Sequence, residues 1–319
     1  MKRRDFIKTA SLAAPMISLF PADLSAIARK SLPGKLEKRS LGRTGEMLSM
    51  IGFGGIVVRD ATPDQASTAV KLAIDAGINY FDVAPSYGDA EVKLGPALEP
   101  YRKDVFLACK TGKRTKAEAR AELEQSLKNL RTDHFDLYQH HAVTNLKDVD
   151  TLLGPGGAME TFVEAKKEGK IRFIGFSAHS VEAAMALMDR FNFDTILFPF
   201  NFTTWHAGNF GPQVMARAQE KQMGILALKA MAKGPWPQGA DRSKYPKCWY
   251  EPLVSPEDIT MGLRFTLSHP ITAAVPPGEE ELFRIALSVS DKIKPLEKSE
   301  IQTIKEKALS GTPLFSYSA

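Results

Sequence analysis

The feature that most constrains the fold is a regular alternation of two kinds of segment from Met50 onward. Short runs rich in β-branched and aromatic residues are separated by longer segments whose apolar residues recur at helical spacing. The segment from Thr62 to Gly77 represents the second kind, because it begins with a Thr-Pro helix start and ends at glycine. The pattern predicts strands over residues 50–53, 79–83, 105–110, 135–141, 171–176, 195–200, 224–229 and 271–275.

The number of strand–helix units decides between two parallel architectures. Eight units in a chain of 319 residues match a closed barrel. A doubly wound sheet usually has about five or six strands and a glycine-rich first turn, and the GFGGIV segment at 52–57 lacks the third glycine of GxGxxG. We therefore predict an α/β fold, a single-domain (β/α)8 TIM barrel over residues 36–315.

The first 28 residues have the three parts of an export signal. Arg3-Arg4 followed by DFIK resembles a twin-arginine signal, an apolar run follows, and Ala26-Ile27-Ala28 has the form of a cleavage site. We predict cleavage after Ala28 and export by the twin-arginine translocation machinery to a periplasmic or other extracytoplasmic location. The apolar run is too short to span a membrane stably, so we expect no stable membrane insertion after cleavage. The alternative is a basic amphipathic N-terminal helix.

Charge and cysteine content exclude several other classes of function. The 42 basic and 37 acidic residues are spread along the chain, so no basic block indicates a nucleic-acid partner. Cys109 and Cys248 lie in no CxxC motif or Cys/His cluster. We therefore expect no metal site and no disulfide framework.

Polar or ionisable side chains follow several predicted strands at the point where each strand ends. They are Asp82, Lys110, His141 and Ser177, and Tyr87 lies in the loop after Asp82. The carboxyl ends of barrel strands converge on one mouth, so these side chains become neighbours in the predicted fold. We call Asp82, Tyr87, Lys110 and His141 the tetrad and predict that it is catalytic.

The chemistry of the tetrad suits proton transfer to an oxygen. A buried lysine beside an aspartate keeps its charge, and this charge is expected to lower the pKa of a nearby phenol. The histidine can donate a hydrogen bond to an oxygen that gains charge. No side chain supplies a hydride, so reduction of a carbonyl would require a cofactor.

Four motifs resemble those of the aldo-keto reductases. The run GINYFDVAPSYG at 77–88 is similar to the family's second-strand motif, which carries the catalytic aspartate and tyrosine. VFLACK ends at Lys110, FDLYQHH ends at His141, and IRFIGFS ends at Ser177, as in the strands with the family's catalytic lysine, catalytic histidine and fifth-strand serine. The resemblance extends from Arg39 to the stretch at 311–315.

The resemblance implies an NAD(P)(H)-dependent enzyme that interconverts a carbonyl (an aldehyde, ketone or keto-sugar) and an alcohol by hydride transfer. Tyr87 is then the general acid or base, and Lys110 and Asp82 adjust its pKa. His141 orients the carbonyl of a small-molecule substrate. Counting from Asp136 as the family motif does selects His141, and His140 is expected to face the other side of the strand. The family's usual state implies a monomer.

The cofactor site departs from the family pattern in several places. The candidate cofactor-binding residues are Gly54, Gly55, Asp82, Ser177, Leu228, Lys229, Gly278 and Arg284. Leu197 replaces a usual glutamine, and Leu228-Lys229 replace an aromatic residue and a serine. The acidic run at 279–281 would repel a 2′-phosphate unless it only begins a helix. The family pattern favours NADP(H), NAD(H) is the alternative, and export favours a tightly bound cofactor.

The loop between the seventh predicted strand and the next helix, residues 231–255, is rich in aromatic residues and is predicted to be a lid or substrate wall. The candidate substrate contacts are Trp205, His206, Trp236 and Trp249. Packing against the barrel rim is the alternative role for them. Two other functions stay open: a non-catalytic ligand-binding barrel, and a lyase or isomerase that uses Lys110 as a base or Schiff-base amine.

Overall fold

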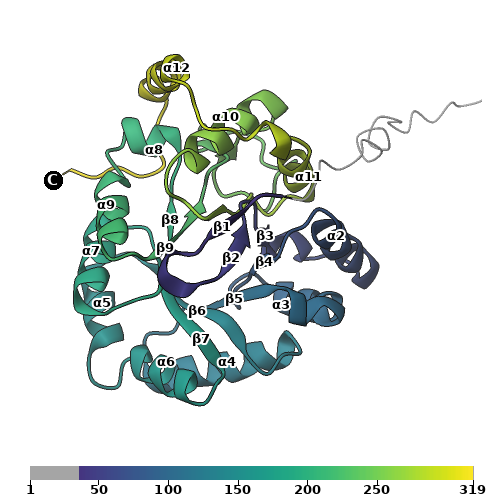
Figure 1. Cartoon of the computed structure of the whole chain (residues 1–319), viewed down its shortest axis with the longest axis vertical. Helices are drawn as coiled ribbons and strands as arrows, with labels where there is room; N and C mark the ends of the chain where they lie inside the picture. Colours follow the sequence, from purple (N-terminus) through teal and green to yellow (C-terminus); the bar gives the residue numbers. More distant parts are fainter. Residues whose placement is uncertain (1–35, 319) are drawn as a thin grey trace, which may run out of the picture. The chain divides into compact units, whose positions relative to one another are not determined.

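The computed structural model describes residues 36–318, which form a barrel of parallel strands surrounded by helices (Figure 1). The eight barrel strands are β3 (Phe53–Gly54), β4 (Tyr80–Asp82), β5 (Phe106–Thr111), β6 (Phe135–Val143), β7 (Ile171–Ala178), β8 (Thr195–Pro199), β9 (Gly224–Leu228) and β12 (Ala273–Ala274). Each predicted strand corresponds to one of these, so the predicted barrel fold is confirmed. The predicted signal peptide lies outside the described residues.

Backbone hydrogen bonds join the first and last strands. Consecutive strands pair in parallel from β3 to β9, and β9 pairs with β12. Ile51 forms a parallel bridge with Ala274, whose amide donates to the Met50 carbonyl at 2.9 Å. The Gly52 amide donates to the Ala274 carbonyl at 3.0 Å. The sheet is thereby closed, and the carboxyl ends of its strands all face the same mouth.

Helices cover the outside of the barrel. They are α2 (Pro63–Asp75), α3 (Ala90–Leu98), α4 (Lys116–Asn129), α5 (Leu146–Leu153), α6 (Ala158–Lys167), α7 (Val181–Arg190), α8 (Phe202–His206), α9 (Pro212–Glu220), α10 (Pro256–Leu267), α11 (Glu280–Ser288) and α12 (Lys298–Leu309). Local sequence explains where they begin. Before α2, the Thr62 hydroxyl accepts from the Gln65 amide while the Gln65 side chain accepts from the Thr62 amide. Ser255 caps α10 by accepting from the Asp258 amide at 3.1 Å.

Side chains alternate between the inside and the outside of the barrel along each strand. A layer of apolar residues fills the middle of the barrel, and its members include Tyr80, Ala108, Leu137, Leu197, Leu226 and Ala273. Two residues further along β4, β5 and β6, the inward side chains are Asp82, Lys110 and Gln139, all buried. The barrel therefore has an apolar middle and a polar layer at its mouth.

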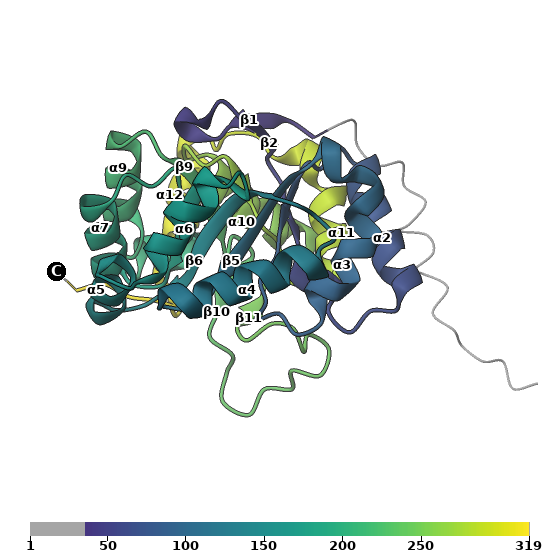
Figure 2. The same ribbon diagram turned by 90° about the horizontal axis from the view of Figure 1, so that it is seen from below.

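The two ends of the barrel are covered by different structures (Figure 2). At the amino end of the strands, β1 (Lys38–Ser40) and β2 (Met47–Ser49) form an antiparallel hairpin, and Leu41 and Leu48 pack into the inner apolar layer. At the opposite end projects the loop that carries β10 (Ala232–Gly234) and β11 (Glu251–Pro252). Within residues 36–318, no helix combines the length and apolar character that a membrane span requires.

Candidate active site

The tetrad residues come together at the carboxyl end of the barrel. Asp82 ends β4, Lys110 and His141 lie near the ends of β5 and β6, and Tyr87 lies in the loop after β4. The Lys110 ammonium donates to Asp82 Oδ2 at 2.5 Å and to the Val83 carbonyl at 3.1 Å. It lies 5.3 Å from the centroid of the Tyr87 ring. The Tyr87 and His141 rings meet edge to face with their centroids 5.7 Å apart.

The ion pair beneath Tyr87 is almost completely removed from solvent. The side chains of Lys110 and Asp82 are only 1% and 2% exposed. The second carboxylate oxygen of Asp82 accepts hydrogen bonds from the Tyr80 hydroxyl and from the side-chain amide of Gln139, both at 3.3 Å. A buried charge is stable only when it is paired and hydrogen-bonded, and these contacts meet that requirement. They fix the ammonium in one position below the phenol ring.

Burial and charge set the protonation states of the tetrad. Burial acts to lower the pKa of Lys110, but Asp82 and Tyr87 outweigh it and the pKa is raised. Burial raises the pKa of Tyr87, and the opposing effect of Lys110 is smaller. Lys110 thus lowers the pKa of Tyr87 as expected, but burial outweighs this effect and the phenol pKa lies above its ordinary value. Burial, the largest cause, and the charge of Lys110, the second largest, hold the pKa of His141 well below its usual range.

At neutral pH the site thus holds a protonated phenol, a charged ammonium and a neutral imidazole. The charged state of Lys110 disfavours the lyase or isomerase alternative, because a Schiff-base amine must lose its proton. The neutral imidazole keeps one N–H and can still donate a hydrogen bond.

A bulge in β6 aims His141 into the mouth. The pairing of β6 with β7 shifts register between His140 and Val143, and Ala142 has a φ of 52°, a left-handed conformation that alanine rarely adopts. As expected, His140 points to the outside of the barrel. There its ring stacks on the ring of Phe162 in α6, and the two ring centroids lie 4.1 Å apart. The two adjacent histidines therefore face different surroundings.

Side chains from neighbouring elements hold this bulge in place. Arg114 donates to the carbonyls of His141 at 3.0 Å and Ala142 at 3.3 Å. Asp148 holds the guanidinium through contacts of 2.9 and 3.1 Å. The Ser177 hydroxyl accepts from the Ala142 amide at 2.8 Å. Three side chains therefore fix the backbone that carries His141.

A cavity of about 270 Å³ opens above the tetrad and includes Asp82, Tyr87 and His141 in its lining. A larger groove of about 1220 Å³ lies among residues at the starts of β5, β6 and β7, and no tetrad residue lines it. Many of its charged residues are paired with one another, for example Arg102 and Arg172 with Asp136 at 3.1 and 2.6 Å. We place the candidate active site in the smaller cavity because it alone contains the tetrad's polar groups.

The candidate cofactor-binding residues divide into two groups. Those that line the cavity are Gly54, Asp82, Leu228, Lys229 and Gly278. Gly55, Ser177 and Arg284 do not line it. The Ser177 hydroxyl is used by the β6 bulge, and Arg284 forms an ion pair with Glu280 at 2.7 Å.

Of the candidate substrate contacts, only Trp249 lines the cavity, with 54% of its surface exposed. Trp205 and His206 lie on α8 and pack against Phe265 of α10. Trp236 donates from its indole nitrogen to a backbone carbonyl of its own loop at 3.0 Å. These three side chains take the alternative role, packing around the barrel.

The cavity also contains side chains that the sequence did not single out as site residues. They include Ile56, His179, Lys247, Tyr250, Pro276, Pro277 and Phe315. Lys247 donates from its ammonium to the Val57 carbonyl at 2.8 Å and from its amide to Glu279 at 2.6 Å. These contacts draw the loop between β9 and α10 across the mouth to the residues after β3 and β12. The only sequence signal for this role was the aromatic content of the loop.

A model of the aldo/keto reductase family matches residues 50–249, which include the whole tetrad and every strand from β3 to β9. The chain belongs to the aldo/keto reductase family. It is therefore an oxidoreductase, an NAD(P)H-dependent reductase.

Individual proteins are similar to this chain in sequence or in fold. The Bacillus subtilis (strain 168) oxidoreductase YqkF is 26% identical over 304 residues, 85% of this chain and 96% of that protein. L-galactose dehydrogenase of Arabidopsis thaliana is 31% identical over 171 residues, which cover 49% of this chain and 53% of the plant enzyme. The holo form of the aldo-keto reductase AKR11C1 from Bacillus halodurans has the same fold, with a TM-score of 0.69 at 23% identity over 89% of this chain and 98% of the other.

The lining residues fit the nicotinamide cofactor that aldo/keto reductases use. Gly54 and Gly278 line the cavity, and at Gly278 a Cβ atom would collide with Ile56. Apolar side chains such as Leu228 and Val275 complete a surface against which a flat ring can pack. Lys247 supplies positive charge near the mouth for phosphate groups.

The acidic run at 279–281 is engaged by other residues. The partners of the three glutamates are, in order, the Lys247 amide at 2.6 Å, Arg284 at 2.7 Å and Lys244 at 3.5 Å. The helix α11 begins at Glu280, so the negative charges also suit the positive end of its dipole. The glutamates therefore have structural partners that reduce their expected repulsion of a phosphate.

Proposed function

We propose that this reductase interconverts a carbonyl and an alcohol by hydride transfer, with Tyr87 as the general acid in reduction and the general base in oxidation. The observation that carries the proposal is the placement of the Tyr87 ring 5.3 Å from the Lys110 ammonium and 5.7 Å from the His141 ring. A proton donor, a fixed positive charge and a hydrogen-bonding imidazole thus surround one small volume. The bound nicotinamide supplies or accepts the hydride.

The tetrad then controls the proton at the substrate oxygen. The phenol of Tyr87 gives its proton to the oxygen as negative charge develops there. The phenolate left behind is stabilised by Lys110, which Asp82 holds in place. Ser86 Oγ lies 3.3 Å from His141 Nδ1, and a hydrogen bond accepted by Nδ1 would leave the ring proton on Nε2 to orient the oxygen.

The substrate we propose is a small aldehyde, ketone or keto-sugar. The relative named L-galactose dehydrogenase supports a sugar-like compound. The exposed Trp249 and the buried Tyr250 give the cavity aromatic surfaces that suit a sugar ring. The direction of the reaction follows from which of the two compounds, carbonyl or alcohol, reaches the enzyme.

We further propose that the cofactor is tightly held, with NADP(H) favoured over NAD(H), and that the enzyme is a monomer exported through the twin-arginine pathway. The loop that Lys247 ties to Val57 and Glu279 supports retention, because it spans the two sides of the mouth. Twin-arginine export carries folded proteins, so a cofactor bound before export would travel with the enzyme. The proposed signal peptide is residues 1–28 and the proposed barrel domain is residues 36–315.

The first experiment titrates NADPH and NADH into the enzyme folded in the cytoplasm, follows nicotinamide fluorescence, and then screens carbonyl compounds. Tyr87→Phe should abolish turnover and leave nucleotide binding intact. Tyr101→Phe, at a tyrosine that does not line the cavity, is the matched control and should behave as the wild type. Failure to bind either nucleotide would favour the non-catalytic ligand-binding barrel instead.

A second experiment tests export. Arg3→Lys combined with Arg4→Lys should leave the enzyme in the cytoplasm, while the wild-type chain should be recovered from the periplasm with nucleotide bound. Equal distribution of the two proteins would contradict the twin-arginine proposal. Exported enzyme that carries no nucleotide and binds none at micromolar concentration would contradict a tightly held cofactor.

A further inference from the structure

Lys229 is an unusual residue in the cavity wall. It follows the last residue of β9 and has a backbone φ of 66°. Residues other than glycine and asparagine rarely adopt this left-handed conformation. This backbone geometry directs the half-buried side chain into the cavity above the tetrad. Strained positions of this kind are common where a side chain serves a site.

Within residues 36–318, no hydrogen-bond acceptor or carboxylate pairs with the Lys229 ammonium. Its neighbours are instead the rings of Tyr250 and Trp249, whose centroids lie 4.9 and 5.2 Å from the nitrogen. The other lysine that lines the cavity, Lys247, donates to the Val57 carbonyl. Lys229 thus presents a positive charge, flanked by aromatic rings, that the described part of the chain leaves unpaired.

The charge of Lys229 acts on the tetrad side of the cavity. Burial, followed by Lys229, lowers the pKa of His179 to about 4, and Lys229 is also among the charges that lower the pKa of His141. Burial, opposed by the Cys248 thiol and helped by Lys110, lowers the pKa of Lys229 itself to about 8. Both histidines are neutral at pH 7, so Lys229 is the charged donor that faces a bound substrate.

We propose that Lys229 binds a carboxylate of the substrate, so that the preferred substrates are carbonyl compounds or alcohols that carry an acid group. The inference rests on the proposed function and narrows it. One ammonium matches the single charge of a carboxylate, whereas a phosphate dianion requires more donors than this part of the cavity offers. The Trp249 and Tyr250 rings shield the ion pair from water and pack against the body of the substrate.

The test compares two matched pairs of probes: 4-carboxybenzaldehyde with its methyl ester, and D-glucuronate with D-glucose. In the wild-type enzyme, kcat/KM for the acid should exceed that for its neutral partner by about tenfold or more, mainly through KM. Lys229→Met keeps the aliphatic stem and should remove this preference. The readout is the ratio of kcat/KM for the acid to kcat/KM for its neutral partner, so a general change in activity does not count as support.

Two further variants keep the test decisive. Lys229→Arg retains the charge and should retain the preference. Lys229→Asn removes the charge and suits the left-handed backbone, so it covers the case in which Lys229→Met folds poorly. Thermal unfolding and circular dichroism report the folding of each variant.

The alternative results are distinguishable. A wild-type enzyme that reduces both members of each pair equally well would overturn the proposal. An increase in the Kd for NADPH with an equal loss of activity on acid and neutral probes would overturn it in favour of a contact with the cofactor phosphates. The proposed function fails separately, if Tyr87→Phe turns over the neutral probes as fast as the wild type does.

Discussion

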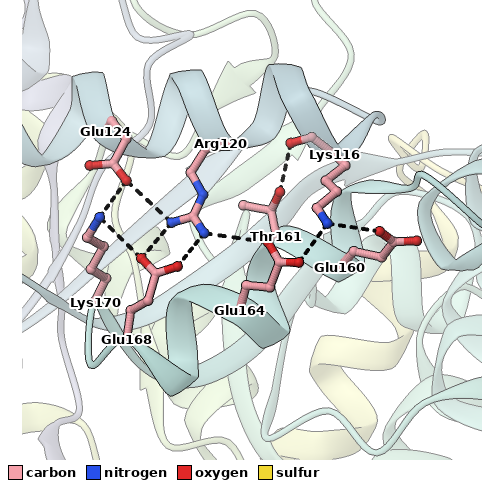
Figure 3. Close-up of polar contacts among 8 residues, drawn as sticks. All are labelled: Lys116, Arg120, Glu124, Glu160, Thr161, Glu164, Glu168 and Lys170. Carbon is pink, nitrogen blue, oxygen red and sulfur yellow. Dashed lines mark hydrogen bonds and ion pairs between the residues drawn. The ribbon is translucent and has the colours of Figure 1, made fainter.

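Two groups of ion pairs in this molecule have the same chemistry and opposite surroundings. The Asp82–Lys110 pair lies inside the barrel mouth with both side chains at most 2% exposed. The second group, which we call the α4–α6 network, lies on the outside between those helices and the start of β7 (Figure 3). Its charged members are Lys116, Arg120, Glu124, Glu160, Glu164, Glu168 and Lys170.

The shortest contacts of the network are as short as the contact of the buried pair. In the network, Lys116 meets Glu164 at 2.6 Å and Arg120 meets Glu168 at 2.5 Å, like the 2.5 Å contact of the buried pair. The network side chains are 28–44% exposed, so water and salt screen their attraction. The buried pair is screened little and cannot be separated without leaving a bare charge. Burial rather than distance therefore decides which ion pair holds a charge fixed for chemistry.

The largest effect on stability and activity is expected for Lys110→Met. It leaves Asp82 buried with only Tyr80 and Gln139 as polar partners, so the free energy of unfolding should fall by about 3–5 kcal/mol. It also removes the charge that stabilises the Tyr87 phenolate, so kcat should fall by roughly 10²–10⁴-fold. Urea unfolding and steady-state kinetics measure the two effects.

The double variant Asp82→Asn with Lys110→Met separates the two effects. It has no uncompensated buried charge and should recover much of the lost stability while staying inactive. Recovery of activity together with stability would show that the charge of Lys110 is not used in the reaction.

A second, smaller effect is expected for Arg114→Met. Arg114 holds the carbonyls of His141 and Ala142, so its loss should let the β6 bulge relax and move the imidazole away from the substrate oxygen. We expect kcat to fall about tenfold with little change in the Kd for NADPH. Arg114→Lys should restore part of kcat. In the α4–α6 network, Arg120→Met is the matched control and should leave kcat unchanged.

These sites differ in how far the sequence predicts them. Asp82 and Lys110 follow from the periods of two strands, since inward positions alternate and the carboxyl ends of barrel strands meet at one mouth. The aim of His141 depends on the left-handed Ala142, and alanine gives no local signal for that conformation. Placement of the histidine on its strand was therefore predictable, and the support from Arg114 was not.

The loop residues that line the cavity were less predictable than the tetrad. Lys247 reaches Val57 across 190 residues of sequence, and no periodic pattern encodes such a contact between loops. Trp205 is the kind of residue expected to contact a substrate but packs against Phe265 of α10, because an aromatic side chain at the barrel rim can also pack on apolar surface outside the mouth. His179 also lines the cavity, although the sequence did not single it out as a site residue.

A third prediction concerns pH and depends on the charge of Lys229. Its pKa is about 8, lowered mainly by burial, so it is charged below that pH and neutral above it. The KM for an acid substrate should therefore rise as the pH increases through about 8, while the KM for the neutral partner should not. The titratable groups that line the same cavity or act on the charge of Lys229 are Asp82, Tyr87, Lys110, His141, His179, Lys247, Cys248 and Tyr250.

His141, His179 and Cys248 do not produce the expected pH effect. The pKa values of His141 and His179 are lowered by burial, the latter to about 4, so both rings are already neutral. Burial raises the pKa of Cys248 to about 12. Lys229→Arg should shift the rise in KM to higher pH, and a rise that persists in Lys229→Met would assign it to another group.

The smallest effect is expected in the α4–α6 network and compares an exposed charge with a buried neutral group. Glu164→Gln removes the negative charge from a 2.6 Å contact to Lys116, yet it should move the urea midpoint little, and any effect should disappear in high salt. Thr161→Val removes only the hydrogen bond from a fully buried hydroxyl to the Lys116 carbonyl at 2.7 Å (Figure 3). It should still lower the free energy of unfolding by about 1–2 kcal/mol, independently of salt.

Neither change should alter kcat, because the network lies on the outer face of the helices. A larger loss of stability from Glu164→Gln than from Thr161→Val would contradict the principle drawn from the two ion-pair groups. It would mean that the exposed network acts cooperatively and that its charges are worth more together than solvent screening of each pair allows.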